Sequence, residues 1–229
     1  MLKQRLVTAL LIIPLLVAAV WFDRSLPWFT VLVAIWGMLA VLELYRMVAA
    51  RKAPPLTYFG LIWTLLFILS RNADLLAIIE PHFDPHLLAP LLFTSAVILP
   101  LIWLVLRRRK EEVFITWAWT LAGILYVGWL LGHLVALRGL DFGQEWVLFA
   151  LFTTFASDST AFFIGQARGR HRLAPGISPR KTWEGAVAGV FGAIVVSLLL
   201  VASLNLPLGY AGTILLSLTV SVFGQAGDL

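Results

Sequence analysis

The sequence contains no cysteine, which excludes disulfide bonds and thiolate metal sites. It also has little charge: 13% of its 229 residues are charged, whereas 61% are hydrophobic. A soluble domain carries roughly 25% charged residues, so this chain has too few to cover a globular surface in water. P-loop, GxSxG and HExxH patterns are missing as well. The low charge and high hydrophobic content exclude a water-soluble protein and indicate a membrane protein.

The sequence contains long apolar runs. A bilayer core of ~30 Å requires about 20 apolar residues in a helix. We interpret these runs as eight spans, at 6–22, 28–48, 56–70, 87–106, 114–137, 146–165, 185–204 and 209–227. The first resembles a secretory signal, and we interpret it as a retained helix because further spans follow it. The predicted fold is all-α, a multi-pass transmembrane helical bundle of about eight spans.

We expect this bundle to be a single integral membrane domain, 1–229. Its N-terminal helices, spans one to five, occupy 1–137. The catalytic-core helices occupy 146–229 and carry a cytoplasmic loop at 166–183.

The basic residues predict an orientation. If all eight segments span with the N-terminus inside, only Arg24, Arg71 and Arg138 of the 17 Lys and Arg residues lie outside. If the short third segment does not span, most of the basic residues move outside, against the positive-inside rule. We therefore expect a cytoplasmic N-terminus. The net charge is +5. In so hydrophobic a chain, basic residues are typical of cytoplasmic loops and not of a nucleic-acid-binding surface, so we expect no nucleic-acid partner.

The loop at 166–183 is the longest polar stretch and leads into Ser178-Pro-Arg-Lys-Thr-Trp-Glu184. Ser is a favoured N-cap and Pro suits the first helical position, so the pattern predicts that a helix begins at Ser178 and Pro179. Arg180 and Lys181 would then lie in the first turn, where the helix dipole disfavours cations unless an anion is bound. This predicts a phosphate site, and an ordinary cap with topogenic charges is the alternative. Glu184 would hold a metal or pair with Lys181.

Two acidic residues stand out in apolar surroundings. Asp158 lies within the sixth predicted span, and a carboxylate at that depth requires a partner or a wet cavity. It shares a small and polar helix face with Thr154, Ala161 and Gly165. A helix-packing face that tolerates one buried acid is the alternative interpretation.

Asp228 ends a second stripe, at helical spacing along the last predicted span. The stripe consists of Thr213, Ser217, Ser221, Gly224 and Asp228. For its hydroxyls we favour contact between helices. Helix contact explains Asp228 less well, because this carboxylate lies at the same predicted edge of the membrane as the basic loop.

Three segments resemble the phosphatidate cytidylyltransferase (CDP-diacylglycerol synthase) family. The segments are Ser157-Asp158-Ser-Thr-Ala-Phe-Phe-Ile-Gly165, Gly169-Arg-His-Arg-Leu-Ala-Pro175 and Ser178-Pro-Arg-Lys-Thr-Trp-Glu-Gly185. The resemblance is dense over 157–192, and Gln225-Ala-Gly-Asp228-Leu229 resembles the start of a second family signature. We expect that signature to continue after Leu229, so that the natural protein is longer and residues 1–229 alone are inactive.

The resemblance implies a reaction and roles. The family condenses CTP with phosphatidic acid to CDP-diacylglycerol and pyrophosphate, with Mg²⁺ as cofactor. By resemblance, Asp158, Lys181, Glu184 and Asp228 are catalytic, and Asp228 and Asp158 hold the metal. The expected substrate-binding residues are Ser178, Arg180, Lys181, Thr182, Arg168, Arg170 and Arg172. The expected partners are CTP, phosphatidic acid and membrane lipids, in the inner membrane of a bacterium with the site facing the cytoplasm. A homodimer is one candidate assembly.

Two alternatives stay open at this stage. A CTP-dependent lipid or polyprenol kinase would share the membrane setting but transfer the γ-phosphoryl group. A transporter or channel would use Asp158 to line an ion path. Its polar residues would be expected to run across the membrane, whereas those of this chain gather at one face.

Overall fold

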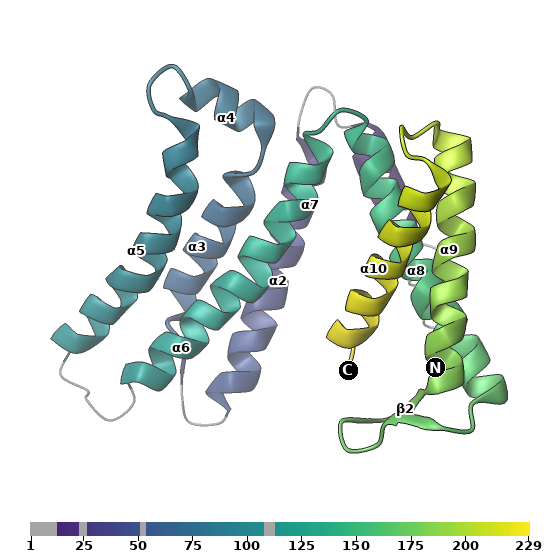
Figure 1. Cartoon of the computed structure of the whole chain (residues 1–229). Coiled ribbons are helices and arrows are strands. Elements are labelled where there is room, and N and C mark those ends of the chain that lie inside the picture. The colour runs from purple at the N-terminus through teal and green to yellow at the C-terminus, as the bar shows by residue number, and fades with distance from the viewer. Residues whose placement is uncertain (1–12, 23–26, 51–53, 108–112) are drawn as a thin grey trace. The chain divides into compact units, whose positions relative to one another are not determined.

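The computed structural model describes residues 13–22, 27–50, 54–107 and 113–229. The chain divides into two compact units, unit 1 (Met1–Asp141) and unit 2 (Phe142–Leu229). Both are built from helices, and the predicted all-α fold is confirmed. Figure 1 shows the elements of each unit, from purple to teal in unit 1 and from green to yellow in unit 2.

Unit 1 is a set of apolar helices: α2 (Trp28–Ala49), α3 (Thr57–Leu69), α4 (Ala73–Ile79), α5 (Pro85–Leu106), α6 (Val113–Gly123), the π-helical segment η1 (Ile124–Trp129) and α7 (Leu130–Arg138). Residues 13–21 are helical as well. The buried Tyr45 explains part of the packing, because its hydroxyl donates a 2.6 Å hydrogen bond to the carbonyl oxygen of Thr120. A side chain at Gly60 or Gly123 would overlap the Tyr45 ring, so both positions require glycine.

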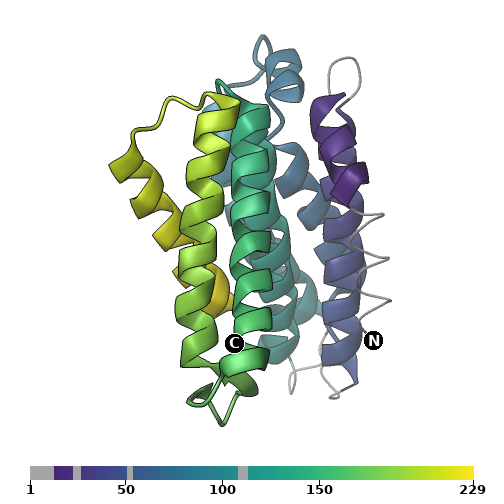
Figure 2. The ribbon, with the colours of Figure 1, turned by 90° about the vertical axis from the view of Figure 1, so that its right-hand side faces the viewer.

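Unit 2 contains α8 (Gly143–Arg168), the two-stranded hairpin β1 (Arg172–Ala174) and β2 (Ser178–Thr182), α9 (Trp183–Leu204) and α10 (Tyr210–Gly227). Helices α8 and α9 run side by side (Figure 2). Their approach depends on small residues, since a Cβ at Gly185 would lie 2.7 Å from the carbonyl oxygen of Ala161. A small residue at this position thus permits close packing of the two helices.

The membrane assignment is confirmed, but eight spans is an overcount. Six helices in the described part of the chain are long and apolar enough to cross a bilayer, or up to seven if the bent pair of α3 and α4 counts as one span. Part of the first predicted span, 6–22, lies outside the described residues. The third predicted span is the main difference. Helix α3 has only 13 residues, and the chain then turns by 91° into α4.

That turn has a local cause. The side-chain oxygen of Asn72 accepts a 2.9 Å hydrogen bond from the backbone N–H of Leu75 and so caps a new helix. The Asn72 amide nitrogen also donates to the hydroxyl of Thr30 on α2, at 2.8 Å. Helix α3 therefore ends at a fixed break before it reaches the length that a bilayer requires. The protein is a multi-pass membrane protein in which this segment is a broken span or a re-entrant element.

The predicted helix start at Ser178 and Pro179 is wrong. Both residues lie in β2, which pairs antiparallel with β1 so that Arg172 faces Thr182 and Ala174 faces Ser178. Helix α9 begins at Trp183, and the hydroxyl of its N-cap Thr182 accepts a hydrogen bond from the N–H of Gly185 at 3.2 Å. The backbone N–H and C=O groups of β2 form hydrogen bonds with β1 in place of the hydrogen bonds that a helix would have provided.

This later start corrects the argument from the helix dipole as well. Arg180 and Lys181 precede the helix, and the first turn carries the acidic residue Glu184, which the dipole favours. The positions of the two basic residues therefore give no sign that an anion binds at the helix terminus. Any phosphate site here has to rest on the side chains themselves.

Candidate functional site

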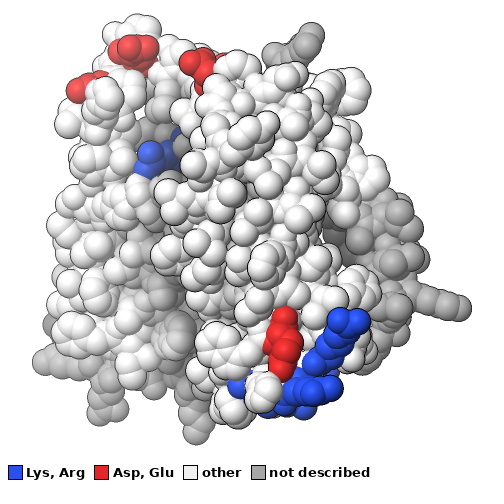
Figure 3. Space-filling model, turned by 45° about the vertical axis from the view of Figure 1, so that its right-hand side comes forward, with Lys and Arg blue, Asp and Glu red and all other residues white. Residues whose placement is uncertain are grey.

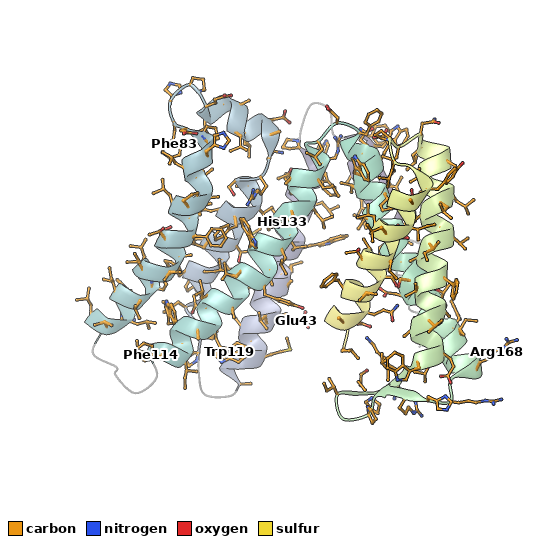
Figure 4. The ribbon with its side chains drawn as sticks, viewed as in Figure 1. Glu43, Phe83, Phe114, Trp119, His133 and Arg168 are labelled. Atoms are coloured by element: carbon orange, nitrogen blue, oxygen red, sulfur yellow. The ribbon has the colours of Figure 1, made fainter. Side chains whose placement is uncertain are left out.

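The site lies at the end of unit 2 where the hairpin connects α8 to α9. Acidic and basic side chains lie next to each other at this end of the molecule (Figure 3). Arg168, at the carboxyl end of α8, is beside the hairpin (Figure 4). Each of the predicted site residues belongs to α8, the loop that follows it, the hairpin, α9 or the end of α10. Unit 2 thus contains the whole predicted set.

A pair of opposite charges joins the hairpin to the end of α10. The Nζ atom of Lys181 lies 2.8 Å from Oδ2 of Asp228 and also donates to the carbonyl oxygen of Gln225 at 3.4 Å. The Lys181 side chain is 24% exposed, whereas that of Asp228 is 72% exposed. The lysine is thus held in a partly buried position, and the carboxylate faces outwards where a ligand has access.

Asp158 completes a three-residue cluster with this pair. It is an exposed residue of α8 and interacts electrostatically with both Asp228, which repels it, and Lys181, which attracts it. The Lys181–Asp228 ion pair therefore lies near enough to Asp158 for each of its charges to act on that carboxylate. An arrangement with one net negative charge is suited to gaining a cation, or to releasing Lys181 towards an anion that arrives with its own cation.

A hydrogen-bonded layer beneath the cluster fixes these three elements. The hydroxyls of Ser157 on α8 and Ser221 on α10 lie 2.7 Å apart and are buried. The amide nitrogen of Gln225 donates to Ser221 at 3.0 Å and to the carbonyl oxygen of Ala186 on α9 at 3.1 Å. The expected contact between helices through the hydroxyls of the last span is confirmed at Ser221.

Gln225 and Ser157 were not predicted to be site residues. Gln225 follows Ser221 by four positions, so helical spacing alone could have placed it on the polar stripe. Ser157 precedes Asp158 directly, and its backbone oxygen would lie 3.0 Å from a Cβ at Gly189. Helix α8 therefore lies against α9 at the residue that precedes the carboxylate. We interpret both residues as supports for the cluster.

Glu184 contacts the loop between α8 and β1. Its Oε2 accepts the backbone N–H of Arg170 at 3.1 Å, and its Oε1 lies 2.7 Å from Nδ1 of His171. Of the two expected uses of Glu184, pairing with Lys181 is not seen, because Lys181 pairs with Asp228. The carboxylate instead fixes the backbone of the segment that carries the basic residues.

The remaining predicted substrate-binding residues have different environments. Thr182 is buried, and its hydroxyl serves as the N-cap of α9. Ser178 is half-buried in β2. The exposed basic residues around the hairpin are Arg168, Arg170, Arg172 and Arg180. Exposed guanidinium groups at one end of the unit form a surface that attracts phosphates.

The carboxylates of the predicted site could hold Mg²⁺ only together with ligands from a substrate. Within the described ranges no group of three or more His, Asp or Glu residues could hold a metal ion by itself. Asp158 and Asp228 supply two carboxylates, and Mg²⁺ is commonly bound by one or two carboxylates together with substrate phosphates. The fit is therefore to an ion whose remaining ligands come with a phosphorylated substrate.

Comparisons with known proteins point to the same chemistry. The chain matches the model of the cytidylyltransferase family over residues 3–229. It is 31% identical to a Bacillus subtilis (strain 168) protein named phosphatidate cytidylyltransferase, over 99% of this chain and 81% of that relative. A relative of the same name from Brucella abortus biovar 1 (strain 9-941) is 38% identical over 48% of this chain and 41% of its own length. For one from Staphylococcus saprophyticus the identity is 32%, over 53% of this chain and 46% of the relative.

Proposed function

The chain belongs to the cytidylyltransferase family, and we propose that it acts as a phosphatidate cytidylyltransferase. In this reaction an oxygen of the phosphatidic acid phosphate attacks the α-phosphorus of CTP. The bond from the α-phosphorus to the oxygen that bridges to the β-phosphorus breaks, and pyrophosphate leaves with that oxygen. The products are CDP-diacylglycerol and pyrophosphate.

One observation carries the proposal: Lys181 pairs with Asp228 at 2.8 Å at the hairpin end of a membrane-embedded unit, and the charges of both act on Asp158. Two substrates that both carry several negative charges must meet for this reaction. A cluster of one ammonium and two carboxylates, beside exposed guanidinium groups, provides charges of both signs within a short distance. The hydrophobic helices that support the cluster give an acyl-chain substrate access from the bilayer.

We assign the roles accordingly. Lys181 leaves Asp228 and contacts phosphate oxygens of CTP, where it stabilises the charge that develops as pyrophosphate departs. Asp228 and Asp158 would hold Mg²⁺, which would neutralise phosphate oxygens when bound. The exposed Arg168, Arg170, Arg172 and Arg180 attract the phosphates. Ser178 and Thr182 lie on the strand that presents Lys181, and Glu184 positions the loop.

We further propose that the protein lies in a bacterial inner membrane with its N-terminus and the site in the cytoplasm, where CTP is made. The distribution of basic residues in the sequence supports this orientation when the bent pair of α3 and α4 crosses the membrane as one broken span. A homodimer is the assembly that we would test first.

The test is a product analysis of the full-length protein in mixed micelles that contain phosphatidic acid, CTP and Mg²⁺. Equal amounts of CDP-diacylglycerol and pyrophosphate are expected. Formation of CDP in place of pyrophosphate would identify a kinase. Solute flux in proteoliposomes without CTP consumption would identify a transporter, and either of these two results would overturn the proposal.

A further inference from the structure

Arg71 of unit 1 is a cation for which the described residues provide no ion-pair partner. It follows the end of α3, at the 91° break before α4. Its Nε atom is buried and has no hydrogen-bond partner. Among the residues that the structure describes, no carboxylate pairs with its guanidinium group. The ion pairs found there, His171–Glu184 and Lys181–Asp228, both lie in unit 2.

The contacts that Arg71 does make orient it. Its Cζ atom lies 4.3 Å from the centroid of the Trp129 ring, and its Cγ would lie 3.2 Å from a Cβ at Gly132 on α7. The indole is itself fixed: the ring of Phe93 is 4.5 Å away, and that of His133 is 4.7 Å away, edge-on. Figure 4 labels His133 on α7, the helix that packs against α3.

The neighbouring polar groups cannot serve as counter-charges. The Asn72 side chain is used by Leu75 and Thr30, and the Ser70 hydroxyl donates to the carbonyl oxygen of Phe67 at 2.8 Å. A guanidinium group offers five N–H donors and does not lose its proton in proteins. In the apolar surroundings of a membrane protein, such a charge is costly unless an anion accompanies it.

We propose that Arg71 is the centre of a binding site for a phosphate group, supplied by the headgroup of an anionic phospholipid or by free phosphate. The planar guanidinium group matches two phosphate oxygens. The half-buried side chain lies at the break in the helix, where a ligand can reach it from outside the unit. The Trp129 ring packs against the guanidinium group and holds it in place. This site uses none of the residues assigned to the cytidylyltransferase reaction.

Arg107 offers a matched control within unit 1. It too lies over a tryptophan, with Cζ 4.7 Å from the centroid of the Trp103 ring, but it is an exposed residue. Water can satisfy its N–H groups, so it needs no bound anion. The variants Arg71→Met and Arg107→Met each remove one guanidinium group that stacks on an indole.

The experiment measures the thermal unfolding midpoint of the full-length protein in a neutral detergent. The additions are dioctanoyl phosphatidylglycerol, dioctanoylglycerol (which lacks the phosphate) and inorganic phosphate. We expect phosphatidylglycerol to raise the midpoint by several degrees and dioctanoylglycerol to have no such effect. The rise should disappear in Arg71→Met and remain in Arg107→Met.

The phosphate addition distinguishes the two sources. An Arg71-dependent rise with inorganic phosphate supports a site for free phosphate, and a rise with the lipid alone supports a headgroup site. If Arg71→Met does not fold, Arg71→Lys is used. It keeps the charge but loses the planar fork, and should require roughly ten times more lipid for the same rise. A rise of equal size and concentration dependence in the wild type and the Arg71 variant would overturn the proposal.

Discussion

Lys181 and Asp228 are 2.8 Å apart although they lie far apart in the sequence of unit 2, one in the strand before α9 and the other at the end of α10. The lysine is the less exposed partner, and the carboxylate is open to a ligand. This pair connects the segment with the clearest family resemblance to the start of the second signature. In the proposed reaction the same ammonium group would exchange this carboxylate for phosphate oxygens of CTP.

Replacement of Lys181 should affect the use of CTP most strongly. Lys181→Met removes the ammonium group and keeps much of the aliphatic stem, so turnover should fall by a factor on the order of 10²–10³. The KM for CTP should rise as well, because the phosphates lose a contact. Initial rates over a range of CTP concentrations check this. Arg46→Met on α2 of unit 1 serves as the control for loss of a basic residue, and equal kinetics in the two variants would contradict the assignment.

The main role of Glu184 should be to hold the backbone of the loop between α8 and β1. Glu184→Gln keeps the size of the side chain but weakens the acceptor for the N–H groups of Arg170 and His171. We expect faster hydrogen exchange at these two amides and a loss of activity of about 10-fold. Hydrogen-exchange mass spectrometry of the loop peptide checks the first part. Unchanged exchange together with a loss as large as that of Lys181→Met would mean that Glu184 contacts the substrates directly.

Gly185 should be required for the contact between α8 and α9. A Cβ there would lie 2.7 Å from a backbone oxygen, which cannot move as a side chain can. Gly185→Ala should therefore destabilise the protein by about 1–3 kcal/mol. Gly224→Ala on α10 is the matched control, because nothing lies within 4 Å of its added Cβ. Thermal unfolding of both variants decides the point, and equal midpoints would show that α8 and α9 are not packed as described.

The cysteine-free sequence permits a direct test of orientation. Single cysteines at Gln166 or Gly176 should react with a membrane-impermeant maleimide only after the cytoplasmic side is opened. One at Asp84 should react in sealed cells. Labelling of position 176 from outside would reverse the proposed orientation and place the site away from CTP.

The helices were predictable because a bilayer imposes a simple requirement on length and hydropathy. The apolar runs at 185–204 and 209–227 agree closely with α9 and α10. The break after α3 was not predictable in the same way. It depends on a hydrogen bond from Asn72 to Thr30, 42 positions earlier in the chain.

The sequence indicated which residues are candidates for the site, but not which of them contact one another. Ser178 and Pro179 have the local pattern of a helix start, and only pairing with β1 makes them extended. Asp158 and Asp228 stood out because carboxylates are costly in apolar spans. That Lys181 pairs with Asp228 and not with Glu184 is decided by the packing of α10 against α9, which no local pattern contains.

Asp158 and Asp228 are the two carboxylates proposed to act with Lys181, and the most direct test of this role is turnover in Asp158→Asn and Asp228→Asn. An amide keeps the size of each side chain but cannot hold Mg²⁺ with a full charge, so both variants should insert normally and lose at least on the order of 10²-fold in rate. The assay follows label from the α-phosphate of CTP into CDP-diacylglycerol, with matched amounts of inserted protein. Near-normal incorporation in both variants would contradict the claim that Asp158, Lys181 and Asp228 form the active site.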